Sequence, residues 1–309
     1  MSIERSDAAR RERIRRMVAR LREPRVVWSI GIYTGDSALH VRPAENAANP
    51  VLAGTDVSDI KADFVADPFI LTVDSTWYMF FEVMNGQRGE GEIGLATSVN
   101  GLNWTYRQIV LVEPFHLSYP YVFAWQGDYY MVPETAQAGE IRIYRATEFP
   151  FRWSFAAALL SNGAFHDASV FRYDAMWWLL TETNPHRTCD TLRLFFAEGL
   201  MGPWTEHPRS PIVAGNPHVA RPAGRVVVGN NVAIRYAQDC YPAYGREVRA
   251  FEITELTTRH YREREVSDNP ILAGNGRGWN AHGMHHIDPH QMEDGRILAC
   301  VDGWTLCRD

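Results

Sequence analysis

Apolar and polar residues alternate in short runs along most of this chain, and the runs combine into hairpins. Three hairpins can be laid over one another, because residues 66–82, 118–134 and 166–182 each contain an apolar strand, a polar turn and a second strand rich in aromatic residues. Short strands separated by turn residues predict antiparallel β-structure. Because no helical pattern lies between the strands, a parallel α/β sheet is not expected.

The hairpins belong to a longer repeat. Each is followed by a third strand and by a turn that carries a tryptophan, at Trp104, Trp153 and Trp204. Repeating units of roughly 45 to 55 residues with about four strands each are typical of propeller blades. We therefore predict an all-β, five-bladed β-propeller whose blades start near residues 65, 117, 165, 219 and 283. The tryptophans, which recur at equivalent turns, are expected to pack between the blades.

The two ends of the chain complete this prediction. The last blade has only its inner pair of strands before the sequence ends, whereas residues 26–33 form an apolar strand without a partner of its own. Pairing the two would close the ring and cover exposed strand edges. Residues 26–309 are thus predicted to form a single propeller domain. Residues 1–25 are predicted to form a short amphipathic helix, because Ile14, Met17, Val18 and Leu21 recur at helical spacing.

Charge and cysteine content narrow the function classes. The formal net charge is −6 and the isoelectric point is near 6, so a nucleic-acid partner is not expected. The four cysteines form neither a CxxC pair nor a disulfide framework. No apolar run is long enough for a membrane span, and the N-terminus lacks the hydrophobic core of a secretion signal. A cytoplasmic protein with free thiols is the expectation.

Acidic residues recur at the two ends of the repeated hairpins. In a propeller the first strand of each blade lines the central channel and the second runs antiparallel, so the start of one and the end of the other share a mouth. The strand starts carry Asp67, Tyr119 and Asp167, and the strand ends, fifteen positions later in each repeat, carry Glu82, Glu134 and Glu182. Carboxylates gathered in one pocket shift each other's pKa values, which suits acid and base chemistry.

The sequence around two of these acids resembles family 43 of the glycoside hydrolases. The likeness lies in residues 66–70 and 77–80, and again in residues 166–171 and 177–179. The resemblance implies a five-bladed propeller that cleaves glycosidic bonds. It also implies that Asp67 is the general base that activates water and that Asp167 orients the general acid and tunes its pKa.

This chain departs from the family pattern at the position of the general acid. Family 43 has a glutamate at the start of the inner strand of blade four, and this chain has Arg221 there. Glu182 or Glu134 is therefore expected as a relocated acid. Residues 221–225, 118–123 and 284–288 resemble instead the propeller domain found beside, or fused to, some glycosyltransferases and formyltransferases, including the N-terminal part of plant glucosamine inositolphosphorylceramide transferases. That resemblance implies a possible glycosyltransferase partner.

Two function hypotheses follow. The first is a carbohydrate-active enzyme that cleaves or transfers a glycosyl unit, in which Arg221 could hold the phosphate or carboxylate of an anionic or nucleotide-linked sugar. The second is a non-catalytic propeller that binds a glycan as an accessory to a glycosyltransferase. The residues expected to contact the sugar are Glu82, Tyr119, Arg221, Tyr236, His285, His286 and Trp304.

A histidine-rich segment at residues 282–290 raises a third hypothesis, a metal-assisted hydrolase. Neighbouring side chains on a strand point to opposite faces, so His285 and His286 are not both expected to face the channel. No residue is therefore assigned as a metal ligand and no cofactor is expected to be required. Some relatives in family 43 hold a hydrated calcium ion near a blade-five histidine, and that resemblance leaves a central calcium ion open here.

Overall fold

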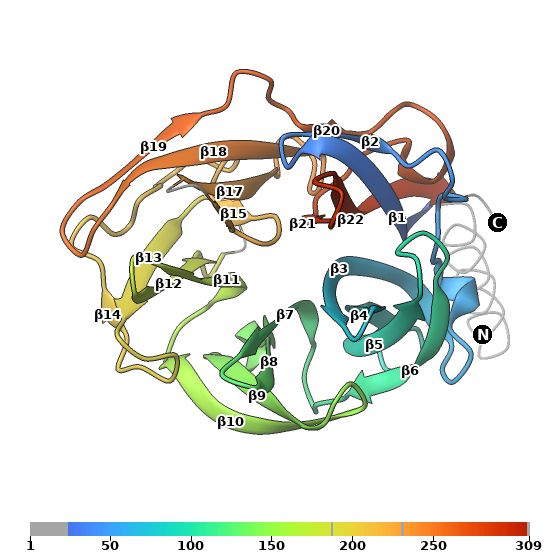
Figure 1. Cartoon of the computed structure of the whole chain (residues 1–309), viewed down its shortest axis with the longest axis horizontal. Coiled ribbons are helices and arrows are strands. Elements are labelled where there is room, and N and C mark those ends of the chain that lie inside the picture. The colour runs from blue at the N-terminus through green and yellow to red at the C-terminus, as the bar shows by residue number, and fades with distance from the viewer. Residues whose placement is uncertain (1–23, 187, 230–231, 308–309) are drawn as a thin grey trace, which may run out of the picture.

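The structure, a computed structural model, describes residues 24–186, 188–229 and 232–307. Five antiparallel sheets stand around a central axis as the blades of a closed ring (Figure 1). The predicted all-β, five-bladed β-propeller is thus confirmed. The helix predicted for residues 1–25 falls almost entirely outside the described residues, and Arg25 already belongs to the first strand. In the described part of the chain, no helix is long and apolar enough to cross a membrane.

Blades one to three each contain four strands in consecutive order. Blade one is β3 (Ala62–Val73), β4 (Thr76–Asn85), β5 (Glu90–Ser98) and β6 (Thr105–Leu111). Blade two is β7 (Ser118–Trp125), β8 (Asp128–Glu134), β9 (Glu140–Glu148) and β10 (Arg152–Ser161). Blade three is β11 (His166–Tyr173), β12 (Met176–Glu182), β13 (Leu192–Ala197) and β14 (Thr205–Glu206).

Blade four is less regular. Its main order is β15 (Arg221–Pro222), β17 (Val232–Asp239), β18 (Glu247–Leu256) and β19 (Tyr261–Glu265). Two short strands complete it, since β16 (Val227–Gly229) pairs with β17 and β20 (Leu272–Ala273) pairs with β18. Three short 3-10 helices lie in connecting loops, at Gly54–Asp56, Ala136–Ala138 and Gly278–Asn280.

Blade five joins the two ends of the chain, as predicted. Its order is β21 (Ile287–Gln291), β22 (Ile297–Cys307), β1 (Arg25–Ser37) and β2 (His40–Pro43). Strands β1 and β22 pair without interruption from Arg25 opposite Cys307 to Gly35 opposite Ile297. Ile30 of β1 is completely buried in the adjoining core. The N-terminal strand therefore closes the ring through both backbone pairing and apolar burial.

Two features hold the blades together. The recurring tryptophans pack against the apolar clusters between blades, and the indole N–H groups of Trp104 and Trp153 both donate to a carbonyl three residues earlier in the chain. Near the axis, the Arg225 Nε atom donates to Asp288 Oδ1 at 2.6 Å, and the Asp288 Oδ2 atom accepts the backbone N–H of Ile70 at 2.7 Å. These buried bonds connect blades four, five and one.

Candidate active site at one mouth of the propeller

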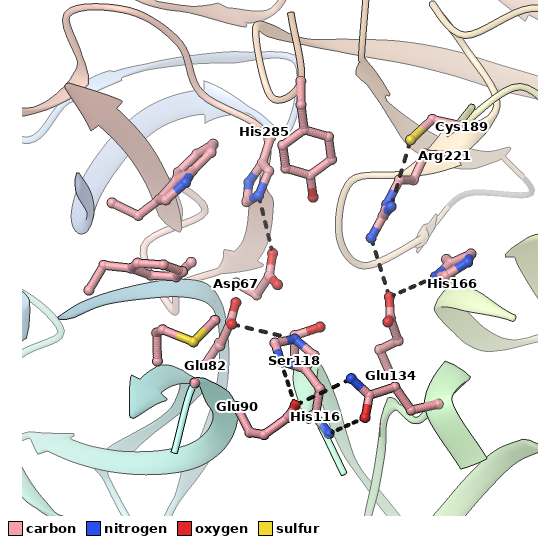
Figure 2. A pocket seen from close by; sticks show the side chains of 17 residues that line it. Asp67, Glu82, Glu90, His116, Ser118, Glu134, His166, Cys189, Arg221 and His285 are labelled. Carbon is pink, nitrogen blue, oxygen red and sulfur yellow. Dashed lines mark hydrogen bonds and ion pairs between the residues drawn. The ribbon is translucent and has the colours of Figure 1, made fainter. Parts of the chain in front are cut away.

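A pocket of about 490 Å³ opens at the mouth where the inner strands begin (Figure 2). Its volume lies in the range of small-molecule binding sites, which is roughly 300 to 1,000 Å³. The side chains that line it come from all five blades and are Trp28, Phe64, Ala66, Asp67, Glu82, Met84, Gly89, Glu90, His116, Ser118, Glu134, Gln137, His166, Cys189, Arg221, Tyr244 and His285. Asp67, Glu82, Glu134, Arg221 and His285 are thus brought together as the sequence predicted.

A repeated backbone bulge creates this arrangement. In blades one to three, the residue just before the bulge in the inner strand pairs with a glutamate of the second strand, and the register then shifts: Ala66 with Glu82, Ser118 with Glu134 and His166 with Glu182. The next residue is left-handed in every case, with φ of 52° at Asp67, 46° at Tyr119 and 51° at Asp167. Such backbone is uncommon outside glycine and marks positions that their surroundings strongly determine. The fifteen-residue spacing therefore reflects the same bulged backbone geometry, repeated in three blades.

Asp67 lies in the pocket wall and is only 5 % exposed. Its Oδ2 atom accepts the backbone N–H of Tyr119 at 3.3 Å, whereas its Oδ1 atom accepts no hydrogen bond from any described residue. The Nε2 atom of His285 lies 3.9 Å from this Oδ1 atom. Burial raises the pKa of Asp67 to about 8, although the charge of His285 acts in the opposite direction. The carboxyl group therefore carries a proton at neutral pH.

Glu82 is the second carboxyl group in this environment. Burial raises its pKa well above the usual range, and the nearby acids Asp67 and Glu134 raise it further. The Oε1 atom of Glu82 lies 3.5 Å from the Nε2 atom of His116 (Figure 2). Burial thus favours the neutral form of two neighbouring carboxyl groups, Asp67 and Glu82, on the blade-one side of the pocket.

Glu134 has the opposite electrostatic environment. Its Oε2 atom lies 3.2 Å from Arg221 Nη2 and 3.3 Å from His166 Nδ1 (Figure 2). Burial alone would raise the pKa of Glu134, but the hydrogen bond from His166 and the charge of Arg221 outweigh it and lower the pKa to about 2. Glu134 is therefore ionised at every pH at which the protein is expected to work, which does not favour it as the relocated general acid.

Asp167 lies outside the pocket lining and contacts the lining residue Arg221. Its Oδ2 atom accepts hydrogen bonds from Arg221 Nε at 2.6 Å and from Gln238 Nε2 at 2.8 Å. Burial raises the pKa of Asp167, and the Arg221 charge opposes that rise. The residue thus fixes the Arg221 side chain, which is a positioning role of the kind that the resemblance to family 43 implied, although it acts here on an arginine.

Glu182, the other candidate for a relocated acid, also lies outside the pocket lining. It is completely buried, and its Oε1 atom accepts the backbone N–H of Asn184 at 2.8 Å. Its pKa is raised by burial. The Glu182 side chain holds the loop that follows β12 and does not line the pocket.

The two adjacent histidines both approach Asp67, since His285 Nε2 lies 3.9 Å and His286 Nδ1 lies 3.7 Å from Asp67 Oδ1. His285 faces the pocket, donates from Nδ1 to Asp302 Oδ1 at 2.8 Å, and stacks on Trp28 with ring centroids 4.0 Å apart. His286 is completely buried, and burial lowers its pKa to about 4. It packs edge-on against Phe69 at a centroid distance of 4.6 Å. His285 lines the pocket and His286 does not, because the His286 ring is enclosed by Phe69 and Tyr119, so the expectation that His286 contacts the sugar is corrected.

Three other residues expected to contact the sugar are also used in packing. The Tyr119 hydroxyl donates to the carbonyl of Gly224 at 2.9 Å in the core around the axis. Tyr236 is 1 % exposed and its hydroxyl donates to the Ala38 carbonyl. Trp304 lies beside the pocket, where its indole N–H donates to the Gly245 carbonyl. None of the three lines the pocket, because each satisfies a polar group between blades.

Several lining residues were not predicted. Ser118 and His166 precede the left-handed residue of their blades and are equivalent to Ala66, so the repeat itself could have identified them. Cys189 and Tyr244 lie in loops outside the repeated strands, and no sequence pattern marks them.

The residues near His285 do not fit a calcium cage. Asp67, His285 and Asp302 each offer one ligand atom within 4.8 Å of the others. However, one Asp302 oxygen accepts from His285 Nδ1 and the other accepts the Asp67 backbone N–H at 2.9 Å. Calcium prefers six to eight oxygen ligands. An ion at this point would take most of its ligands from water.

The rest of the 282–290 segment is dispersed. His282 stacks on Trp304 at a centroid distance of 5.1 Å, outside the pocket lining. Asp288 is paired with Arg225, and His290 Nε2 lies 2.9 Å from Asp288 Oδ2. The histidines and the aspartate of this segment therefore do not converge on one point, which argues against the hypothesis of a metal-assisted hydrolase built on them.

The closed ring of five blades resembles in fold the propellers of several glycoside hydrolases. The fold is similar to a family 117 glycoside hydrolase of Zobellia galactanivorans, with a TM-score of 0.53 and 12 % identity over 92 % of both chains. It is also similar to a family 43 glycoside hydrolase of Bacillus licheniformis, with a TM-score of 0.56 and 12 % identity over 82 % of this chain and 55 % of that one. At these identities the likeness shows the fold.

Sequence comparison gives the family. The family described as "Glucosamine inositolphosphorylceramide transferase 1, N-terminal" matches residues 22–304, and the chain belongs to it. Glucosamine inositolphosphorylceramide transferase 1 of Oryza sativa subsp. japonica is 35 % identical over 296 residues, which cover 89 % of this chain and 40 % of the relative. The Arabidopsis thaliana protein of the same name is 31 % identical and is covered to 39 %. The chain thus spans about 40 % of the length of these relatives.

Proposed function

We propose that the pocket binds a sugar unit of a glycan or glycolipid and catalyses the cleavage or transfer of a glycosyl group by acid and electrostatic catalysis. The observation that carries this proposal is the contrast between two carboxyl groups in one cavity, because Asp67 is buried with an unpartnered Oδ1 atom whereas Glu134 lies against Arg221 and His166. The pKa of Asp67 is raised to about 8 by burial, and the pKa of Glu134 is lowered to about 2 by its hydrogen bond with His166 and the charge of Arg221, which outweigh its burial. Environments that separate two carboxyl pKa values in this way are characteristic of acid–base sites.

The roles follow from these protonation states. Cleavage of a glycosidic bond needs a carboxylic acid that protonates the leaving oxygen and a carboxylate that stabilises the positive charge developing on the sugar ring or activates water. Asp67, with its proton and its unpartnered Oδ1 atom, fits the acid. Glu134 fits the ionised carboxylate. This proposal reverses the roles expected from the sequence, in which Asp67 was the base and Glu134 a candidate acid.

Aromatic side chains support sugar binding at the same mouth. Trp28 lies in the lining and is stacked on His285, and Tyr244 is partly exposed above Arg221 at 5.3 Å from the guanidinium carbon to the ring centroid. Aromatic faces with a few fixed polar groups are a common way to hold a small ligand. The names of the relatives and of the propeller neighbours agree with a carbohydrate ligand, and an anionic or nucleotide-linked sugar remains part of the proposal because of Arg221.

The substitution Asp67→Asn tests the acid role. Asparagine keeps the shape and the left-handed backbone but cannot donate an acidic proton, so turnover should fall by about 10²-fold or more while the affinity for the sugar changes little. Asp74→Asn is the matched control, because Asp74 is left-handed too, with φ of 48°, and is exposed on the same blade. Release of the aglycone from aryl glycosides and of the nucleotide from nucleotide-sugars would be measured. Wild-type turnover by Asp67→Asn would refute the assignment.

A non-catalytic sugar-binding propeller is the second candidate, and one observation favours it. Arg221 occupies the place of the family 43 acid and is paired with both Asp167 and Glu134, so it removes two carboxylates from free use. In that case the wild-type chain and Asp67→Asn would both bind sugar, and neither would turn it over. A glycosyltransferase partner belongs to this second candidate, and co-purification tests it. A cytoplasmic location is proposed for either candidate, and cell fractionation tests it.

A further inference from the structure

Two cysteines of neighbouring blades meet beside the pocket. Cys189 follows β12 of blade three and lines the pocket, and Cys240 follows β17 of blade four. A hydrogen bond joins the two thiol groups. The segment at residues 216–217 holds their backbones together, because Asn216 N donates to the carbonyl of Asp190 at 3.2 Å and Cys240 N donates to the carbonyl of Pro217 at 3.0 Å.

The surroundings of Cys189 favour its thiolate form. Arg221 Nη1 donates to the Cys189 sulfur at 3.7 Å (Figure 2). The hydrogen bond from Cys240 and the Arg221 charge outweigh burial and lower the pKa of Cys189 to about 6, while the same hydrogen bond raises the pKa of Cys240. Cys189 is therefore the nucleophile of the pair, and Cys240 holds the proton.

The other two thiols provide a contrast. Cys300 is completely buried, its thiol donates to the carbonyl of Pro68, and burial raises its pKa. Cys307 is exposed at the end of β22, opposite Arg25 of β1. Neither Cys300 nor Cys307 shares the position of Cys189, which lies in the pocket wall beside both a second thiol and the Arg221 guanidinium. The chain thus contains one buried thiol and one exposed thiol that serve as internal references for reactivity.

We propose that Cys189 and Cys240 form an oxidisable thiol pair in the wall of the pocket, which a hydroperoxide converts into a disulfide. The Cys189 thiolate attacks the terminal peroxide oxygen, the O–O bond breaks, and the leaving alkoxide or hydroxide takes up a proton. Cys189 is then a sulfenic acid. The Cys240 sulfur loses its proton and attacks the Cys189 sulfur, the S–O bond breaks, and hydroxide leaves with that proton as water. Two thiols and one hydroperoxide give one disulfide, one alcohol or water, and one water.

Oxidation changes the pocket through Arg221. The disulfide removes the thiolate that accepts a hydrogen bond from the guanidinium, whereas the contacts of Arg221 with the carboxylates of Asp167 and Glu134 remain. The wall of the pocket then gains positive charge relative to the reduced state. Oxidation of the pair requires only the two thiols and their geometry, so it can occur whether or not the pocket is catalytic.

Peptide mapping of the full chain tests the pair. The reduced protein is treated with hydrogen peroxide at neutral pH, remaining thiols are blocked with an alkylating reagent, and the digest is analysed without reduction. We expect a cross-linked peptide that contains Cys189 and Cys240, that disappears on treatment with dithiothreitol, and that forms at least about tenfold faster than any oxidation of Cys300. The variant Cys307→Ser, a change at an exposed site, is the matched control and should form the same cross-link at the same rate.

Two variants separate the roles. In Cys240→Ser the sulfenic acid of Cys189 has no resolving thiol and should be trapped by dimedone, whereas in Cys189→Ser the oxidation of Cys240 should slow at least about tenfold. If the wild-type chain gives no such cross-link, or if Cys307 oxidises before Cys189, the proposal is wrong. The wild-type measurement decides the matter even if a variant does not fold, and it requires no sugar ligand, so its outcome is independent of the proposed function.

Discussion

Asp67 is an acid that the fold buries among other acids, and its replacement by asparagine should stabilise the protein in a pH-dependent way. Burial raises the pKa of Asp67 to about 8 in the fold, from an ordinary value of 3.8. Above pH 3.8 the unfolded chain ionises this group while the folded chain still holds the proton. The stability that the neutral carboxyl contributes is therefore complete below pH 3.8 and is lost as the pH rises to about 8.

Linkage gives the size of this loss. Each unit of pH between the two pKa values costs about 1.4 kcal/mol of unfolding free energy. Asparagine does not ionise, so Asp67→Asn should be more stable than the wild type by about 1 kcal/mol at pH 4.5 and by about 5 kcal/mol at pH 7.5, with little further gain above pH 8. The hydrogen bond from the Tyr119 N–H can be kept, because the asparagine oxygen can accept it as the Asp67 carboxyl oxygen does.

Equilibrium urea unfolding followed by tryptophan fluorescence measures the difference, since the chain contains ten tryptophans. The same experiment on Asp74→Asn controls for the left-handed backbone, and its stability difference from the wild type should stay within about 0.5 kcal/mol at every pH. A stability difference for Asp67→Asn that is constant between pH 4.5 and pH 7.5 would refute the reasoning, because the carboxyl group would then have an ordinary pKa. Loss of turnover together with a gain in stability would identify a site that trades stability for activity.

Three further predictions concern stability and reactivity. Asp288→Ala leaves the buried Arg225 guanidinium without its carboxylate and should lower the unfolding free energy by about 3 to 5 kcal/mol in urea titrations. Glu148→Ala breaks an exposed ion pair with Arg152 and should lower it by at most about 1 kcal/mol. Equal losses would contradict the stabilising role of the Arg225–Asp288 pair. Ile30→Ala should lower the unfolding free energy by about 2 to 5 kcal/mol, because Ile30 is completely buried in the closing strand β1. Val26→Ala, at a residue that is 46 % exposed on the same strand, should change it by about 0.5 kcal/mol or less. Similar values for both variants would argue that apolar burial does not close the ring. The alkylation rate of Cys189 should increase as the pH rises through about 6, because the thiolate forms there, and mass spectrometry of iodoacetamide adducts should give that midpoint; a midpoint above pH 8 would contradict the stabilised thiolate.

The repeat was readable from sequence because it is local. Each hairpin is contained within about 17 residues of chain, and the fixed alternation of a strand determines which ends of neighbouring strands meet. Asp67 and Glu82 are therefore neighbours whatever the rest of the ring does, and the same holds for the pairs in blades two and three. The closing strand could be predicted for a related reason, since an unpaired apolar strand and an incomplete blade each need a partner.

The contacts between blades were decided only by the tertiary structure. Arg221 is 54 positions from Asp167 and 87 from Glu134, and no sequence pattern indicates that one guanidinium binds both. That binding, together with His166, makes Glu134 an ionised carboxylate, while burial makes Asp67 a protonated one. The sequence by itself therefore determined that acids gather at one mouth of a five-bladed ring. Which of them holds a proton depends on desolvation and on charges a few ångströms away across blade boundaries, and those distances exist only in the folded molecule.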